Sequence, residues 1–165
     1  MSASVRPARL SDAASLGCVR SAAIADADRT ERTPQTSQAE SSDLARLIEE
    51  QPGLVHVADS NGSVVGYLAL QRAAHPAVRA RSPIQLWQLY VVRPFHGTGV
   101  AAQLMSAALE HARTQRHDVI WLGVSQHNVR AMTFYRKQGF EALGLHEVGS
   151  AGHAHQDVVM LRAVR

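Results

Sequence analysis

The chain has 165 residues, a length that suits one compact unit, and we expect residues 1–165 to form a single domain. Hydrophobic residues make up 45% of the chain and charged residues 19%, a globular balance that excludes a wholly disordered protein. The formal net charge of +3 is spread along the sequence, which argues against nucleic acid as a partner.

The sequence has none of the usual marks of a membrane or exported protein. Its longest apolar run, residues 64–70, is far shorter than the roughly 20 residues that a membrane helix needs. Residues 1–7 lack the apolar core of a signal peptide, and the single cysteine, Cys18, cannot form an internal disulfide. We therefore expect a soluble cytoplasmic protein with no membrane partner, and a Cys18 thiol packed in the core.

The first half of the chain predicts a strand, two helices and a hairpin. Residues 4–8 predict a strand. The cap residues Ser11 and Asp12 predict a helix whose apolar face holds Ala14, Leu16, Val19 and Ile24.

Residues 25–40 are polar and predict a loop, and residues 43–51 predict a second helix that ends at Pro52-Gly53. Asn61-Gly62 lies between two apolar runs, 54–58 and 64–68, and this pattern predicts a β-hairpin.

The second half predicts alternating strands and helices. Residues 84–92 predict a strand that is apolar on both faces, followed by a helix from Val100 to Ala112 and a buried strand over residues 119–124. A short helix over 128–137 then ends at Gly139, before two last strands at 140–148 and 156–163. The order β-α-α-β-β-β-α-β-α-β-β predicts an α/β sandwich around a mixed sheet.

A glycine-containing turn joins the predicted strand at 84–92 to the helix that follows it. Glycines let a ligand approach the backbone closely, and the amides in the first turn of a helix attract phosphate. A pyrophosphate would therefore fit against the amides of Gly97 to Ala102. The alternative is a tight turn that needs glycine only for its own geometry.

The same turn formally matches the dinucleotide fingerprint G-x-G-x-x-A. Two features count against a Rossmann fold. Four residues, Arg93 to His96, separate the strand from the first glycine, and the next strand ends in Ser125-Gln126 without a carboxylate for a ribose hydroxyl.

A second segment, Asn128 to Phe140, is equally rich in functional residue types. Asn128 is a natural helix N-cap, and Ala131 and Phe134 are inward positions. Tyr135 follows Phe134, so its ring can lie beside the buried face with its hydroxyl accessible. The alternative is a half-buried structural tyrosine.

Together the two segments resemble the GNAT family of N-acetyltransferases. The first is similar to the family's acetyl-CoA signature R/Q-x-x-G-x-G/A, at His96, Gly99 and Ala101, although His96 stands where the family usually has arginine or glutamine. The second is similar to N-x-x-A-x-x-F-Y-x-K-x-G-F, at Asn128, Ala131, Phe134, Tyr135, Lys137, Gly139 and Phe140.

The resemblance implies a three-layer sandwich, with helices on both faces of a mixed central sheet of about seven strands. It also implies direct acetyl transfer from acetyl-CoA, its cosubstrate, to a primary amine. The backbone N–H of Val91 would then stabilise the oxyanion, and Tyr135 would protonate the CoA thiolate. The cofactor-binding residues implied are Tyr90, Val91, Val92, His96, Gly97, Thr98, Gly99, Val100, Ala101, Ala102, Asn128, Tyr135 and Lys137, with Arg130 as an alternative to Lys137.

The general base is left open. The strand at 84–92 carries Gln85 and Gln88 where family members often have a carboxylate, and an amide cannot accept the proton. The alternatives are a water chain, no base at all, or one of Glu147, His146, His153 and His155 from the last hairpin. Two histidines, His153 and His155, are too few for a metal site, so we expect no metal.

The acceptor expected from the resemblance is a small-molecule amine. The segments Trp121–Val124, Gly144 to Gly149 and Asp157–Met160 are similar to a bacterial branch that includes spermidine/spermine acetyltransferases, and Asp26, Asp28 and Glu31 would attract a polyamine. The alternatives are a peptide or protein acceptor, or a weakly catalytic acyl-CoA sensor. A homodimer is compatible with the family, although the sequence reveals no interface.

Overall fold

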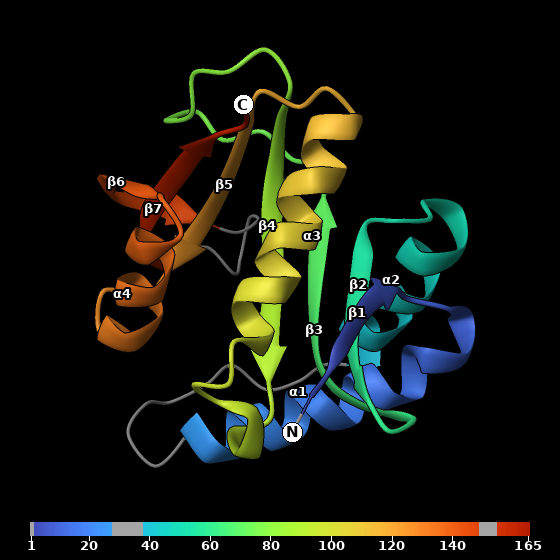
Figure 1. The fold of residues 1–165 in the computed structure, drawn as a ribbon. Coiled ribbons are helices and arrows are strands. Elements are labelled where there is room, and N and C mark those ends of the chain that lie inside the picture. Colours follow the sequence, from blue (N-terminus) through green and yellow to red (C-terminus); the bar gives the residue numbers. More distant parts are fainter. Residues whose placement is uncertain (1, 28–37, 149–154) are drawn as a thin grey trace. The chain divides into compact units, whose positions relative to one another are not determined.

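The computed structural model describes residues 2–27, 38–148 and 155–165 (Figure 1). Seven strands form one mixed sheet in the order β1-β2-β3-β4-β5-β7-β6. The strands are β1 (Ser4–Pro7), β2 (Val55–Ser60), β3 (Ser63–Gln71), β4 (Pro83–Val91), β5 (Val119–Val124), β6 (Glu141–Val148) and β7 (His155–Ala163). The helices among these residues are α1 (Ala13–Ala27), α2 (Gln38–Glu50), α3 (Val100–Thr114) and α4 (Val129–Lys137). The predicted α/β class and element order are confirmed.

The chain divides into two compact units. Unit 1 comprises Met1–Leu70 and Trp87–His111, and unit 2 comprises Gln71–Leu86 and Ala112–Arg165. Within the described part of the chain, no helix has both the length and the apolar character to cross a membrane. The single domain expected over residues 1–165 stays a prediction.

The hairpin predicted at Asn61-Gly62 joins β2 to β3 in unit 1. The two residues have φ values of +53° and +80°, the left-handed backbone that a two-residue type I′ turn requires. Strands β1, β2 and β3 pair antiparallel, and the register places Val57 opposite Tyr67 and His56 opposite Leu68. This register puts alternate residues on opposite faces of the three strands.

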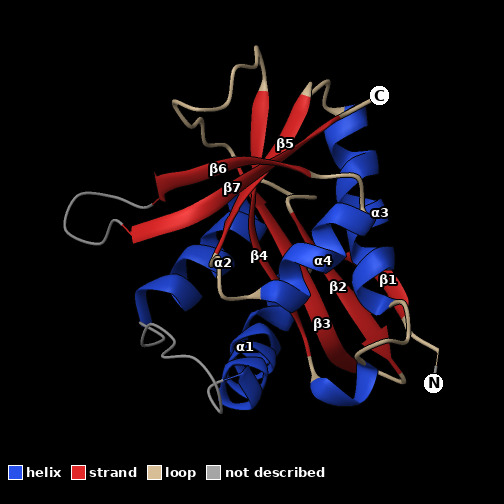
Figure 2. Cartoon of the chain, turned by 90° about the vertical axis from the view of Figure 1, so that its left-hand side faces the viewer, coloured by secondary structure: helices blue, strands red, loops and turns tan. Residues whose placement is uncertain are grey.

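Helices cover both faces of these strands (Figure 2). One face packs against α1 and α2 through a buried cluster of Leu16, Val19, Leu44, Ile48, Val55, Val57, Tyr67 and Ala69. On the opposite face His56 meets His111 of α3, with ring centroids 6.2 Å apart. The predicted placement of helices on both faces therefore holds for unit 1.

The prediction for the first helix was wrong at two side chains. Ala14 and the Cys18 thiol are exposed, whereas Leu16, Val19 and Arg20 are buried. Two residues advance the chain by about 200° around an α-helix, so Cys18 points away from the face that Leu16 buries. The apolar residues next to Cys18 in the sequence did not indicate which face of α1 packs against the sheet.

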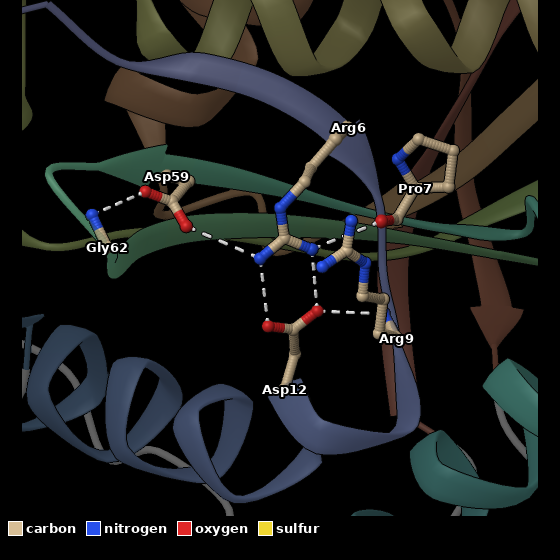
Figure 3. Close-up of polar contacts among 6 residues, drawn as sticks. All are labelled: Arg6, Pro7, Arg9, Asp12, Asp59 and Gly62. Carbon is tan, nitrogen blue, oxygen red and sulfur yellow. Dashed lines mark hydrogen bonds and ion pairs between the residues drawn. The ribbon is translucent and has the colours of Figure 1, made fainter.

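An ion-pair network ties the start of the chain to the hairpin (Figure 3). The Arg6 guanidinium donates to both carboxylate oxygens of Asp12, at 2.8 and 3.0 Å, and to Asp59 at 3.3 Å. Asp12 also accepts from the Arg9 backbone N–H at 2.7 Å. The Arg6 hydrogen bonds hold the pKa of Asp12 below its usual range. The network should therefore stabilise the fold above the ordinary pKa of aspartate and lose its effect as the pH falls through the lowered one.

Replacing Asp12 with asparagine should lower the free energy of unfolding by about 1–2 kcal/mol at pH 7, because it removes a charge-assisted pair whose carboxylate is 10% exposed. Chemical denaturation measures the loss. Asp43→Asn, at an exposed position, is the matched control and should change stability by less than about 0.5 kcal/mol. An equal effect of the two substitutions would contradict a stabilising network.

His56 makes the stability of unit 1 sensitive to acid. Burial, and secondarily the neighbouring His111, lowers its pKa from 6.5 to about 4. The unfolded chain therefore takes up a proton near pH 6.5 that the folded chain refuses until about pH 4. We expect stability to fall across this window, by up to about 3 kcal/mol, and His56→Gln to flatten that dependence. Denaturant midpoints between pH 4 and 7 test this, and an unchanged slope in the variant would contradict it.

In unit 2, β5 is the central strand. It pairs parallel with the start of β4 and antiparallel with β7, which pairs antiparallel with β6. Trp121 of β5 is buried in a cluster with Val78 and Val159, and its indole N–H donates to the Ala73 carbonyl at 2.8 Å. The segment that precedes β4 thus packs on the face of β5 that Trp121 shares with Gly123.

Candidate active site

The glycine turn of unit 1 has the backbone conformation that its sequence predicts. Gly97 and Gly99 have φ values of +76° and +91°, and both are exposed. A Cβ on either would meet nothing within 4 Å, so the turn borders open space. Helix α3 starts next, at Val100, and the amides in the first turn of a helix have no partner within the helix.

The rest of α3 explains why the turn is held in place. Val100 is buried, as are Leu104, Met105, Ala108 and Ala112 further along the helix. Val100 would therefore meet a ligand through its backbone amide rather than its side chain. Ala101 and Ala102 are half-buried, and the Thr98 hydroxyl donates to the Phe95 carbonyl at 2.7 Å.

The end of β4 is fixed by a contact that the sequence did not predict. The His96 ring donates from Nε2 to the Val91 carbonyl at 2.7 Å, and the Val92 backbone N–H donates to Val65 at 3.0 Å. A Cβ at Gly66 would lie 3.0 Å from the Tyr90 carbonyl and from Val91. These contacts fix the backbone of residues 90–92. They also engage Nε2 of His96 in a hydrogen bond within the protein.

Tyr90 lies beside a buried arginine of α1. Its ring centroid is 5.7 Å from that of Tyr67 and 5.9 Å from the Arg20 guanidinium carbon. Arg20 is 6% exposed. The apolar pattern of the helix did not predict that Arg20 is buried, because an arginine next to Val19 in the sequence is typical of a solvent-exposed helix position.

Helix α4 of unit 2 carries the second predicted set. Asn128 caps the helix as expected, its Oδ1 accepting from the Ala131 N–H at 3.0 Å. Tyr135 is 9% exposed, and its ring contacts Phe134 and Phe140 edge-on at 5.4 and 5.7 Å. Lys137 is exposed in the last turn. Aromatic packing thus buries Tyr135, whereas Lys137 is open to solvent.

Strand β4 carries Gln85 and Gln88 where a carboxylate base was looked for, and both glutamine side chains are buried and hydrogen-bonded. In unit 1 Gln88 accepts from the Tyr67 hydroxyl at 2.7 Å. In unit 2 Gln85 accepts from the Gln71 amide at 2.6 Å. Neither side chain can take a proton from an ammonium group.

Unit 2 also contains a buried carboxylate that the sequence analysis missed. Asp157 of β7 is 8% exposed and lies 3.1 Å from Nε2 of His155, measured from Oδ2. The signal available in the sequence was the alternation of His155, Asp157 and Val159, which places all three on one face of a strand. His153 lies outside the described residues.

No three His, Cys, Asp or Glu side chains gather as a metal site would need, within residues 2–27, 38–148 and 155–165. The expected absence of a metal stays a prediction.

Comparison with known proteins decides the family. A family profile described as the acetyltransferase (GNAT) family matches residues 22–140, most of the chain. The chain belongs to the GNAT family. It is therefore an acetyl-CoA-dependent N-acetyltransferase, as the two motifs predicted.

Relatives in sequence carry the same activity in their names. An uncharacterised N-acetyltransferase of Mycobacterium tuberculosis is 34% identical over 119 residues, which cover 72% of this chain and 72% of that protein. N-acetyltransferase family 8 member 2 of Rattus norvegicus is 30% identical over 69% of this chain and 50% of its own length.

Solved structures share the fold. An acetyltransferase of Salmonella typhimurium, solved with its cofactor acetyl-CoA, is 18% identical with a TM-score of 0.75, covering 100% of this chain and 95% of its own. Naa50 of Arabidopsis thaliana, in complex with the bisubstrate analogue CoA-Ac-MVNAL, is 18% identical with a TM-score of 0.71, covering 98% and 99%. At these identities the likeness is one of fold.

Proposed function

We propose that this GNAT enzyme transfers acetyl from acetyl-CoA directly to a primary amine of a small molecule. The observation that carries the proposal is the open, left-handed turn at Gly97 and Gly99 ahead of helix α3, which is buried along one face. Such a turn offers backbone amides and the positive end of a helix dipole to a pyrophosphate. Membership of the GNAT family indicates which acetyl donor contains this pyrophosphate, namely acetyl-CoA.

The proposed donor contacts are mainly backbone. The strand-like backbone of Tyr90, Val91 and Val92 would pair with the pantetheine arm, and the turn from His96 to Ala102 would bind the pyrophosphate. Asn128 uses Oδ1 for its cap, so its Nδ2 is the group it can offer to a pantetheine amide. The exposed side chains of Lys137 and Arg130 are weaker candidates for the phosphates.

The proposed chemistry needs an oxyanion donor and an acid. The backbone N–H of Val91 would stabilise the oxyanion formed on the thioester carbonyl, a contribution of about 3–4 kcal/mol to the barrier where such donors have been removed. His96 would support this role, because its ring holds the Val91 carbonyl at 2.7 Å. Tyr135 would protonate the departing thiolate.

The acceptor is the least constrained part of the proposal. Asp26 forms an ion pair with Arg93 at 3.1 Å, so its charge is compensated and attracts a polyamine less than the sequence suggested. Asp28 and Glu31 lie outside the described residues. The spermidine/spermine-like branch therefore remains one proposal among small amines.

A peptide amine is the second candidate. One observation favours it: the fold is shared with Naa50, bound to a peptide-bearing bisubstrate analogue, and with a ribosomal-protein-alanine N-acetyltransferase from Brucella melitensis, which is 24% identical with a TM-score of 0.71. Homodimer formation and a cytoplasmic location stay predictions.

The experiment measures CoA thiol released from acetyl-CoA across polyamines, amino-acid amides, aminoglycosides and short peptides, with calorimetry of acetyl-CoA binding alongside. Cys18→Ser removes the exposed protein thiol from the background. Release that depends on one small-amine class is the expected result. Release only with peptides would favour the second candidate. Binding without release would favour an acyl-CoA sensor, and absence of binding would contradict the proposed function.

A further inference from the structure

A glycine of β3 lies against the peptide group that links Tyr90 to Val91. A Cβ on Gly66 would lie 3.0 Å from the Tyr90 carbonyl oxygen, 3.0 Å from Val91 Cγ2 and 3.4 Å from Val91 Cα. Two of these three atoms belong to the backbone of β4, so a methyl group at position 66 would displace the strand. The close approach of β4 to β3 therefore depends on the missing side chain of Gly66.

The next peptide group, between Val91 and Val92, is held at both ends. Nε2 of His96 donates to the Val91 carbonyl at 2.7 Å, and the Val92 N–H donates to the Val65 carbonyl at 3.0 Å. Val65 immediately precedes Gly66 in β3, so neighbouring residues of one strand contact both peptide groups. The two peptide planes that flank the Cα of Val91 are thus restrained.

These contacts fix the direction of the Val91 N–H. In an extended strand the N–H and C=O of one residue point to the same edge, and successive residues alternate. The Val92 N–H points to β3, so the N–H of Val91 points to the opposite edge, where His96 binds the Val91 carbonyl. A peptide group is planar, so the position of the Tyr90 carbonyl also sets the orientation of the Val91 N–H.

We propose that Gly66 and His96 act together as positioning residues for acetyl transfer, by directing the Val91 N–H at the oxyanion. The inference rests on the proposed function, in which this N–H stabilises the oxyanion of the thioester. The N–H donates a hydrogen bond and exchanges no proton. A misplacement of about 1 Å in an active site can cost roughly 100-fold in rate, so a smaller displacement of this donor has a measurable effect.

A purely structural role for Gly66 makes a different prediction. Both roles predict that Gly66→Ala lowers stability, because the methyl group crowds two strands. Only the positioning role predicts a slower chemical step with acetyl-CoA binding retained. The three atoms nearest to the added Cβ belong to Tyr90 and Val91 and not to the glycine turn at Gly97 and Gly99, so the pyrophosphate contacts should persist.

The test measures the rate of acetyl transfer in a single turnover, with enzyme in excess over acetyl-CoA and a saturating amine, so that product release does not mask the chemical step. Gly66→Ala should lower this rate by roughly 30-fold and leave the Kd for acetyl-CoA within about threefold by calorimetry. Ala69→Val is the matched control, because Ala69 is a fully buried residue of the same strand in the cluster against α1 and α2. It should lower the melting temperature similarly but change the rate by less than about twofold.

A second pair of variants tests the contact from His96, and it does not depend on the folding of Gly66→Ala. His96→Gln keeps an N–H donor at about the same reach, whereas His96→Asn is one methylene shorter and loses the Val91 carbonyl. His96→Asn should therefore be roughly tenfold slower than His96→Gln. Combining Gly66→Ala with His96→Asn should lower the rate by less than the product of the two single effects, because both act through one N–H.

The outcomes separate this inference from the proposed function. A wild type that binds acetyl-CoA but transfers acetyl to no amine, or that binds none, overturns both. An active wild type with Gly66→Ala slowed no more than Ala69→Val overturns this inference alone. So does a Gly66→Ala variant that loses acetyl-CoA affinity at an unchanged rate, and so do equal rates for the two His96 variants.

Discussion

Replacing Gly99 with valine is expected to weaken acetyl-CoA binding about 100-fold, which corresponds to roughly 3 kcal/mol. Gly99 has a φ of +91°, a conformation that a β-branched residue strongly disfavours. A Cβ there would point into open space, so valine would clash with no protein atom. The loss would therefore come from backbone strain and from a side chain standing where the pyrophosphate approaches.

Gly62→Val is the matched control for this prediction. Gly62 also has a positive φ, +80°, and a Cβ there would also meet nothing within 4 Å, but it lies in the β2–β3 hairpin turn. Both variants should lose similar stability, while only Gly99→Val should lose acetyl-CoA affinity by calorimetry. Equal affinities in the two variants would mean that the pyrophosphate binds elsewhere.

Tyr135→Phe is expected to lower kcat by about 10- to 100-fold while leaving the Kd for acetyl-CoA within about twofold. Phenylalanine keeps the edge contacts to Phe134 and Phe140 and removes only the hydroxyl. This decrease in kcat lies at the low end of the range for removal of a general acid, because a thiol of pKa about 8.5 is already a fair leaving group. Steady-state kinetics with the best amine of the panel measure it.

A second hydroxyl deletion tests whether the effect is chemical. Tyr67→Phe removes the buried hydroxyl that donates to Gln88 at 2.7 Å. It should lower the melting temperature, since it leaves a buried acceptor without that donor, but change kcat by less than about twofold. An undiminished kcat in Tyr135→Phe would remove this residue as the acid.

Local chemistry explains which features the sequence could predict. Asn61-Gly62 between two apolar runs is a strong local signal for a hairpin turn. Asn128 ahead of an apolar helical face is likewise a local signal for a helix N-cap. The glycines at 97 and 99 have positive φ as their turn requires. Each of these features depends on a few neighbouring residues, so the sequence contains the whole cause.

Features that depend on which face an element buries were harder to predict. Cys18 is exposed because α1 meets the sheet through Leu16 and Val19, a choice set by tertiary packing. Asp157 is buried because Gly123 on a neighbouring strand leaves room for it, and the two lie 34 positions apart in the sequence. Neither cause is visible in a local window.

The measurement that tests the central claim most directly is acetyl transfer itself. Acetyl-CoA with a ¹³C-labelled acetyl group is incubated with the wild-type protein and the small amines of the panel, and intact-mass spectrometry follows both product and protein. We predict a labelled amide on the amine nitrogen and no acetyl added to the protein, including at the exposed Cys18. A labelled protein that passes its acetyl group to the amine would contradict direct transfer, and no labelled amine with any acceptor would contradict the proposed function.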